Sequence, residues 1–216
     1  MEESGSSNNV FSRQIMSSTK LLEVIYELYR RDYIERIEEM RNPNIVYVTD
    51  LVGCSHKYWF RTKFPELAFY FEPALVLGEL VHKGLEAILA SQGYSIEYPV
   101  EHHVFIDDRE YVVKGRVDAW NPVSREVVEI KTARSSHGVP HEHHILQLQI
   151  YMEILGVDKG LLVYITPDRL LEYTVLKASV DIEGFVRELV GDSVHPRWDW
   201  ECRYCVYSKL CPYRRV

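Results

Sequence analysis

The stretch GRVDAWNPVSREVVEIKT, residues 115–132, decides the predicted fold and carries the sharpest chemistry of the chain. Apolar and β-branched residues fill residues 110–120 and 126–132, so two strands are predicted there. The Asn121-Pro122 pair between them is typical of a turn. The stretch therefore predicts a hairpin in the centre of a sheet.

Acidic and basic side chains gather on one face of this hairpin. Residues two apart in a strand project from the same side, so Glu129 and Lys131 point together while Ile130 points into the core. Across the turn, Asp118 can approach Glu129 on that face. Two close carboxylates repel each other unless a cation or a proton intervenes. Carboxylates are the oxygen ligands that Mg²⁺ or Mn²⁺ requires, and the Ile130 carbonyl can add a third oxygen.

This constellation has the parts of a metal-dependent phosphodiesterase. A bound cation polarises a phosphate and lowers the pKa of a water molecule. Lys131 can orient that water or neutralise charge that develops on the phosphate. The alternative is a solvated strand face with an ordinary ion pair, and so short a motif leaves both interpretations open.

The elements expected around the hairpin alternate between helices and strands. Helical periodicity predicts helices at 19–40, 73–91, 142–155 and from Ser179 or Asp181 to about 190. Further strands are expected at 45–48, 96–106, 160–166 and 170–177, with a turn that carries Cys54 and a loop at 133–140. This order favours an α/β fold with a central mixed sheet flanked by helices.

Two predicted helices carry polar side chains of interest. His82 lies in an otherwise apolar helix, and an isolated histidine there is more often structural than a ligand. Glu86, one turn later, can orient it, although a solvated charge is the favoured interpretation. Gln147 and Tyr151 share one helical face, and both can reach a sugar-phosphate backbone or form ordinary helix surface.

Composition limits the class of protein. The 216 residues carry a formal charge of −7, so any nucleic-acid contact must come from a local patch. The polar leader at 1–17 has no secretory core, and no stretch has the apolar length of a membrane span. These features predict a soluble, cytoplasmic protein without a membrane partner.

The four cysteines are spaced for a metal site. Cys202, Cys205 and Cys211 crowd the last fifteen residues, and Cys54 stands far upstream. Intracellular thiols rarely form structural disulfides, so a closed site that ties the chain ends together is expected. Thiolates bind zinc and iron–sulfur clusters alike, and spacing alone slightly favours zinc.

Taken in order, these motifs resemble a known family. His82, Asp118, Glu129-x-Lys131 and Gln147-x-x-x-Tyr151 are similar to the motif series of RecB-like nucleases in the PD-(D/E)xK superfamily. Cys54 with the C-terminal cysteines resembles the iron–sulfur branch of that family, and the chain length resembles the CRISPR-associated RecB-family exonucleases. The resemblance covers residues 45–215.

The resemblance implies a role for each of these residues. His82, Asp118, Glu129 and the Ile130 carbonyl would bind Mg²⁺ or Mn²⁺, and Lys131 would assist the attacking water. Gln147 and Tyr151 would hold the active site and the strand. The cysteines Cys54, Cys202, Cys205 and Cys211 would bind a [4Fe–4S] cluster, so the resemblance reverses the preference for zinc.

The implied organisation is a restriction-endonuclease-like core at 45–191, preceded by an N-terminal helical region at 1–44 and followed by an iron–sulfur tail at 192–216. The implied activity is cleavage of single-stranded DNA from its ends, which trims fragments before CRISPR integration together with the integrase subunits. The alternatives are a standalone viral or DNA-repair nuclease and a non-catalytic iron–sulfur subunit that binds nucleic acid.

Two groups of rings lie outside the motifs. The tail interleaves basic residues with Trp198, Trp200, Tyr204, Tyr207 and Tyr213, which are expected mainly to shield the cluster and only weakly indicate stacking on unpaired bases. Of the histidines near the 133–140 loop, His144 is expected to approach phosphate. The other three, His137, His141 and His143, are expected to be solvated.

Overall fold

The computed structural model describes residues 18–215, and the polar leader expected at 1–17 lies outside the described residues. The chain divides into two compact units at residues 35/36. Helix α1 (Lys20–Arg41) begins in the first unit and ends in the second. Among the described residues, no helix has both the length and the apolar character needed to cross a bilayer.

The second unit contains a six-stranded mixed sheet, as the sequence predicts. The sheet order is β1-β3-β4-β5-β6, and β2 pairs with β3. Pairs β1/β3 and β4/β5 are parallel, whereas β2/β3, β3/β4 and β5/β6 are antiparallel. The strands are β1 (Ile45–Tyr47), β2 (Ser95–Ile106), β3 (Arg109–Asn121), β4 (Glu126–Thr132), β5 (Lys159–Ile165) and β6 (Leu170–Leu176).

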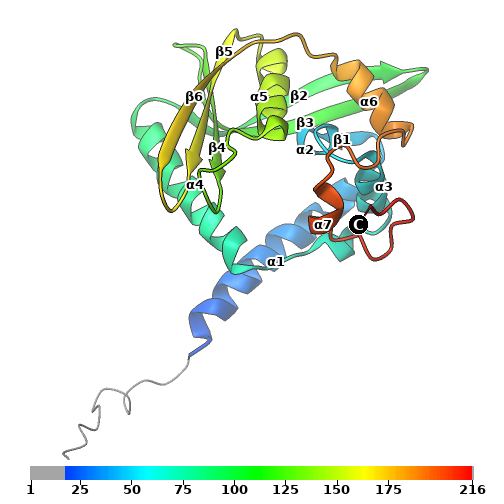
Figure 1. Ribbon diagram of the computed structural model, residues 1–216, viewed down its shortest axis with the longest axis horizontal. Helices are drawn as coiled ribbons and strands as arrows, with labels where there is room; N and C mark the ends of the chain where they lie inside the picture. Colours follow the sequence, from blue (N-terminus) through cyan, green and yellow to red (C-terminus); the bar gives the residue numbers. More distant parts are fainter. Residues whose placement is uncertain (1–17, 216) are drawn as a thin grey trace, which may run out of the picture. The chain divides into compact units, whose positions relative to one another are not determined.

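Helices cover both faces of this sheet. Helix α4 (Pro73–Ser91) and helix α5 (Glu142–Leu155) lie on opposite sides of strands β4–β6 (Figure 1). On β4, Val127 belongs to the core cluster that contains α5, and Val128 belongs to the cluster that contacts α4. A strand buried on both faces needs a nearly continuous apolar run, which explains the sequence of β4.

The predicted helix ends agree with the structure where local signals are strong. Helix α5 has the expected bounds, and Gly156 closes it in the left-handed conformation at φ 63°. Helix α6 (Ile182–Val190) begins after Asp181, whose carboxylate accepts the Gly184 N–H. The predicted cap at Asp181 is therefore confirmed.

The sequence missed the helices around Cys54. A turn was expected there, but the chain forms α2 (Val48–Leu51), α3 (Ser55–Lys63) and the 3₁₀ helix η2 (Pro65–Ala68). Helix α3 has no aliphatic stripe, and its buried Arg61 instead donates to the carbonyls of Met40 and Ile45 at 2.7 and 2.9 Å. These partners come from distant elements, so periodicity could not reveal the helix.

One tyrosine hydroxyl fixes the start of α5 to β5. Tyr164 is fully buried, and its hydroxyl accepts the His141 N–H at 3.0 Å and lies 2.7 Å from His144 Nδ1. Burial, followed by the charges of Lys131 and His143, lowers the pKa of His144 from 6.5 to about 2. A neutral imidazole can accept the hydroxyl proton, whereas a protonated one cannot.

We predict that His144→Asn makes the fold less sensitive to acid. An unfolded histidine binds a proton below about pH 6.5, but folded His144 remains neutral until about pH 2. This contribution to stability is therefore present above pH 6.5 and is lost as the pH falls toward 2, at about 1.4 kcal/mol per pH unit. Between pH 7 and pH 5 the wild type should lose about 2 kcal/mol more than the variant in urea unfolding.

His137→Asn is the matched control, because His137 is an exposed loop residue. It should leave the pH dependence of the wild type unchanged. Equal losses of stability in the wild type and His144→Asn would show that this histidine is not held neutral by the fold.

Candidate active site

The site begins where strands β3 and β4 separate. Their ladder pairs Ala119 with Val128 and does not continue toward Asp118. The Ile130 N–H instead donates to Asp118 Oδ2 at 2.6 Å. A side-chain carboxylate thus replaces a missing strand partner, which satisfies the backbone and fixes Asp118 at the fork.

Glu129 lies in the core beside this fork. Glu129 is only 2% exposed, and Lys131 Nζ lies 2.7 Å from Glu129 Oε1. This contact confirms that Glu129 and Lys131 project together, and Ile130 is fully buried with Ala119 and Val128 as expected. Burial raises the pKa of Glu129 to about 7, and the charge of Lys131 opposes that rise.

Helix α5 orders these charges through Gln147. Its amide Nε2 donates to Glu129 Oε1 at 2.8 Å, and its Oε1 accepts from Lys131 Nζ at 2.9 Å. Tyr151, one turn further, donates its hydroxyl to the Arg116 carbonyl at 3.2 Å. Both side chains are buried, so they are not the ordinary helix surface that the sequence left open.

Gly115 makes the approach of Tyr151 possible. An added Cβ would lie 2.5 Å from Tyr151 Cε1 and 2.9 Å from Val48 Cγ2. Non-bonded carbon atoms do not approach each other so closely, so a glycine is required where the Tyr151 ring crosses β3.

Helix α4 approaches the fork from the other side. His82 Nδ1 lies 3.5 Å from Asp118 Oδ1, and this interaction raises the pKa of His82. One ligand atom each from His82, Glu86 and Asp118 lies within 4.8 Å of the others, a group suited to a metal ion. The interpretation of Glu86 as a solvated charge is wrong, because the residue is 8% exposed and burial raises its pKa.

The two carboxylates are therefore contacted from different helices. Asp118 meets His82 and Glu86 of α4, whereas Glu129 meets Gln147 of α5. They still interact, since the charge of Asp118 contributes to the raised pKa of Glu129. Sequence reasoning had noted Glu86 at its i+4 spacing from His82, but it favoured the wrong one of the two interpretations.

The four cysteines surround one cavity. All four are free thiols, and they line a cavity of about 100 Å³ together with Phe60, Trp200 and others. Burial raises the pKa of Cys54 to about 11 and also raises that of Cys205. The predicted meeting of Cys54 with the C-terminal cysteines is thus a feature of the fold.

Hydrogen bonds also fasten the tail to the Cys54 region. The Glu201 carboxylate of α7 (Glu201–Tyr204) accepts the backbone N–H groups of Cys54, Arg197 and Trp198 at 2.8–3.0 Å. The Trp198 indole donates to the Val52 carbonyl at 2.8 Å. Figure 1 shows the tail beside α3, far from it in sequence.

The histidines of the α5 region are not all solvated. His137 is exposed as expected, but the ring centroid of His143 lies 4.7 Å from that of Trp200. Burial lowers the pKa of His143 to about 4. The expectation of a solvated His143 is therefore wrong, because the tail packs against the start of α5.

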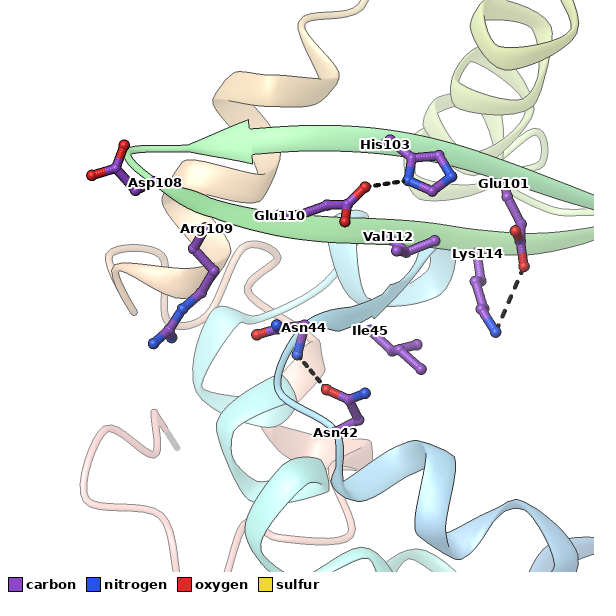
Figure 2. Close-up of a pocket in the computed structure, with 10 residues that line it drawn as sticks. All are labelled: Asn42, Asn44, Ile45, Glu101, His103, Asp108, Arg109, Glu110, Val112 and Lys114. Atoms are coloured by element: carbon purple, nitrogen blue, oxygen red, sulfur yellow. Dashed lines mark hydrogen bonds and ion pairs between the residues drawn. The ribbon is translucent and has the colours of Figure 1, made fainter.

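A second cavity, of about 570 Å³, lies at the other end of β3 (Figure 2). Two pairs of its charged or polar side chains contact each other, His103 Nδ1 with Glu110 at 2.7 Å and Lys114 Nζ with Glu101 at 3.6 Å. None of the carboxylates at the fork lines it. The candidate catalytic residues therefore lie at the fork and not at this cavity.

Known proteins are similar to this chain in sequence and in fold. A scan against family models finds no match. The chain is 38% identical over 196 residues to the CRISPR-associated exonuclease Cas4 of Saccharolobus solfataricus, with 86% of this chain and 96% of that protein covered. The level of identity and the near-complete coverage show a shared family.

Solved structures agree with this relationship. The crystal structure of SSO0001 superposes with a TM-score of 0.82 at 34% identity, covering 89% of this chain and 98% of that one. An alkaline exonuclease from Laribacter hongkongensis gives a TM-score of 0.50 at 13% identity over 69% of this chain and 86% of its own, a likeness of fold alone. The chain is a nuclease of the CRISPR-associated Cas4 exonuclease family.

Proposed function

We propose that this nuclease is a metal-dependent deoxyribonuclease that hydrolyses phosphodiester bonds from single-stranded DNA ends. The observation that carries the proposal is Glu129 Oε2, a buried carboxylate oxygen that has no hydrogen-bond partner among residues 18–215. An unpartnered buried carboxylate oxygen is costly. A divalent cation is the partner that would satisfy it.

The neighbouring donors fit such a cation. Asp118, Glu129, His82 and the Ile130 carbonyl offer the hard oxygen and imidazole donors that Mg²⁺ or Mn²⁺ accepts. When bound, the ion supplies an activated water and stabilises charge on the phosphate. Lys131, held by Gln147 and Glu129, keeps its ammonium beside that charge and orients the attacking water.

We predict that Glu129→Gln and Asp118→Asn each lower Mn²⁺-dependent cleavage of end-labelled single-stranded DNA by about a hundredfold or more. Each change removes a negative charge from the proposed cation site while its shape is kept. Far-UV circular dichroism should be unchanged, and EDTA should abolish cleavage by the wild type. Double-stranded DNA with the same label should be cut more slowly.

Glu172→Gln is the matched control, since it removes one exposed carboxylate from β6 of the same sheet. It should cleave at the rate of the wild type. Cleavage retained in both Glu129→Gln and Asp118→Asn would reject the assignment, and cleavage in EDTA would reject metal dependence.

We also propose that the four cysteines bind a [4Fe–4S] cluster. Cysteine sulfurs around a tetrahedral zinc lie about 3.8 Å apart, given a Zn–S distance of about 2.3 Å. Among residues 18–215, no three cysteine Sγ atoms lie within 4.8 Å of one another, and a cavity of about 100 Å³ lies between them. The wider spacing supports a cluster larger than a single ion.

We predict that Cys202→Ala removes visible absorption near about 400 nm and lowers thermal stability, because cluster binding contributes to folding. Absorbance, iron content and thermal unfolding measure this. Ser208→Ala is the control, since Ser208 lines the same cavity without a thiol and should keep colour and stability. A colourless wild type with one bound zinc would overturn the cluster assignment.

We further propose that the substrate ends belong to DNA fragments captured for CRISPR adaptation, with the integrase subunits as partners. Membership in a CRISPR-associated family supports this context. Trimming of a fragment with single-stranded overhangs, measured with and without the integrase subunits, tests it. Trimming that produces no integrated fragment would favour a standalone nuclease instead.

A further inference from the structure

The catalytic face of α5 extends one turn beyond the residues already described. Tyr151, Gln147 and His143 follow each other at intervals of four, so they lie along one side of the helix. Gln147 contacts both Glu129 and Lys131. His143 is therefore the next side chain toward the start of α5, and the charge of Lys131 is felt at its ring.

A second ring joins His143 from the cysteine-bearing tail. The centroid of Trp200 lies 4.7 Å from that of His143, with 50° between the ring planes. Trp200 also lines the cysteine cavity, and the residue is still 42% exposed. The two rings adjoin the catalytic stripe of α5, and Trp200, which partly covers His143, keeps an exposed face of the pair toward solvent.

The chemistry of this step suits a nucleobase. An aromatic ring stacks on any unpaired base, because every base has a π-face. Burial keeps the pKa of His143 at about 4, so at neutral pH the imidazole is an uncharged ring and not a phosphate-binding cation. The neighbouring Lys131 supplies the positive charge for the backbone.

We propose that Trp200, supported by His143, forms a stacking subsite for one unpaired base of the DNA strand, next to the phosphate at the fork. This subsite rests on the proposed nuclease function and deepens it, because it makes the preference for single strands a property of two named rings. A paired base cannot stack there without leaving its duplex, which costs unstacking energy.

The chain contains a matched pair of rings elsewhere. Trp59 is 40% exposed and stacks on His56 with 5.2 Å between centroids and 4° between planes. This pair belongs to α3, where His56 Nδ1 is bonded to Asp192 at 2.7 Å. Trp59→Ala therefore removes an equally exposed tryptophan, also beside a histidine, without touching the catalytic stripe.

The test combines changes in the protein with changes in the DNA. The probe is a fluorescein-labelled oligothymidylate in which a single abasic residue is moved along the strand. Binding is measured by anisotropy with Mn²⁺ in the Glu129→Gln background of the full chain, and cleavage is measured in the active enzyme. At one position, loss of the base should weaken wild-type binding about tenfold.

Trp200→Ala and His143→Ala should each weaken binding to the intact strand about tenfold, and at that same position the abasic residue should then cost nothing more. Trp200→Phe should restore the sensitivity, and Trp59→Ala should behave as the wild type. Because Trp200 lines the cysteine cavity, its variants are checked for visible absorption. His143→Ala, which lies outside that cavity, carries the test if colour is lost.

Two results would overturn the subsite, and they differ from failure of the nuclease itself. The subsite is rejected if the enzyme still cleaves DNA but removal of a base weakens binding equally in the wild type and the variants at every position. It is also rejected if the enzyme still cleaves DNA but removal of a base weakens binding at no position. If the wild type neither binds nor cuts DNA, the proposed function and the subsite fall together.

Discussion

The burial of the Glu129 carboxylate beside Lys131 is the constraint on which the site depends. A charge at 2% exposure is tolerated only with close partners, and Lys131 and Gln147 supply them on one oxygen while the other has none. The remaining oxygen is the atom that the proposed cation would satisfy. Under the proposed function, burial of this carboxylate lowers stability and serves the chemistry at the same atom, as is common where ionisable groups are buried for function.

The fork between β3 and β4 explains why this atom is reachable. Where the two strands separate, the Ile130 N–H loses its ladder partner and Asp118 replaces it. The opening admits His82 and Glu86 from α4 on one side and Gln147 from α5 on the other. A continuous sheet would have closed the same space with backbone hydrogen bonds.

The C-terminal tail is held against the Cys54 region and the start of α5 by contacts of Glu201 and Trp200, which are separate from its cysteines. Glu201 gathers three backbone N–H groups, including that of Cys54, and so sets the cysteines around their cavity. Trp200 then brings the tail against His143 at the start of α5. The cysteine cavity and the face of α5 that carries Gln147 are therefore linked through one pair of rings.

The sequence by itself determined the parts of the fold that depend on local physics. The alternation around Glu129 and the stop at Gly156 act over a few residues, so β4 and α5 could be placed correctly, and the ordered motifs identified the family. Only the tertiary structure decided which residues are buried by segments that are distant in the sequence. Helix α3 is held by Arg61 bonds to Met40 and Ile45, Glu86 is buried beside His82 and Asp118 at the fork, and His143 is partly buried because Trp200 of the tail packs against it. Burial by distant segments leaves no periodic signal in the chain, which is why these residues were misjudged or missed.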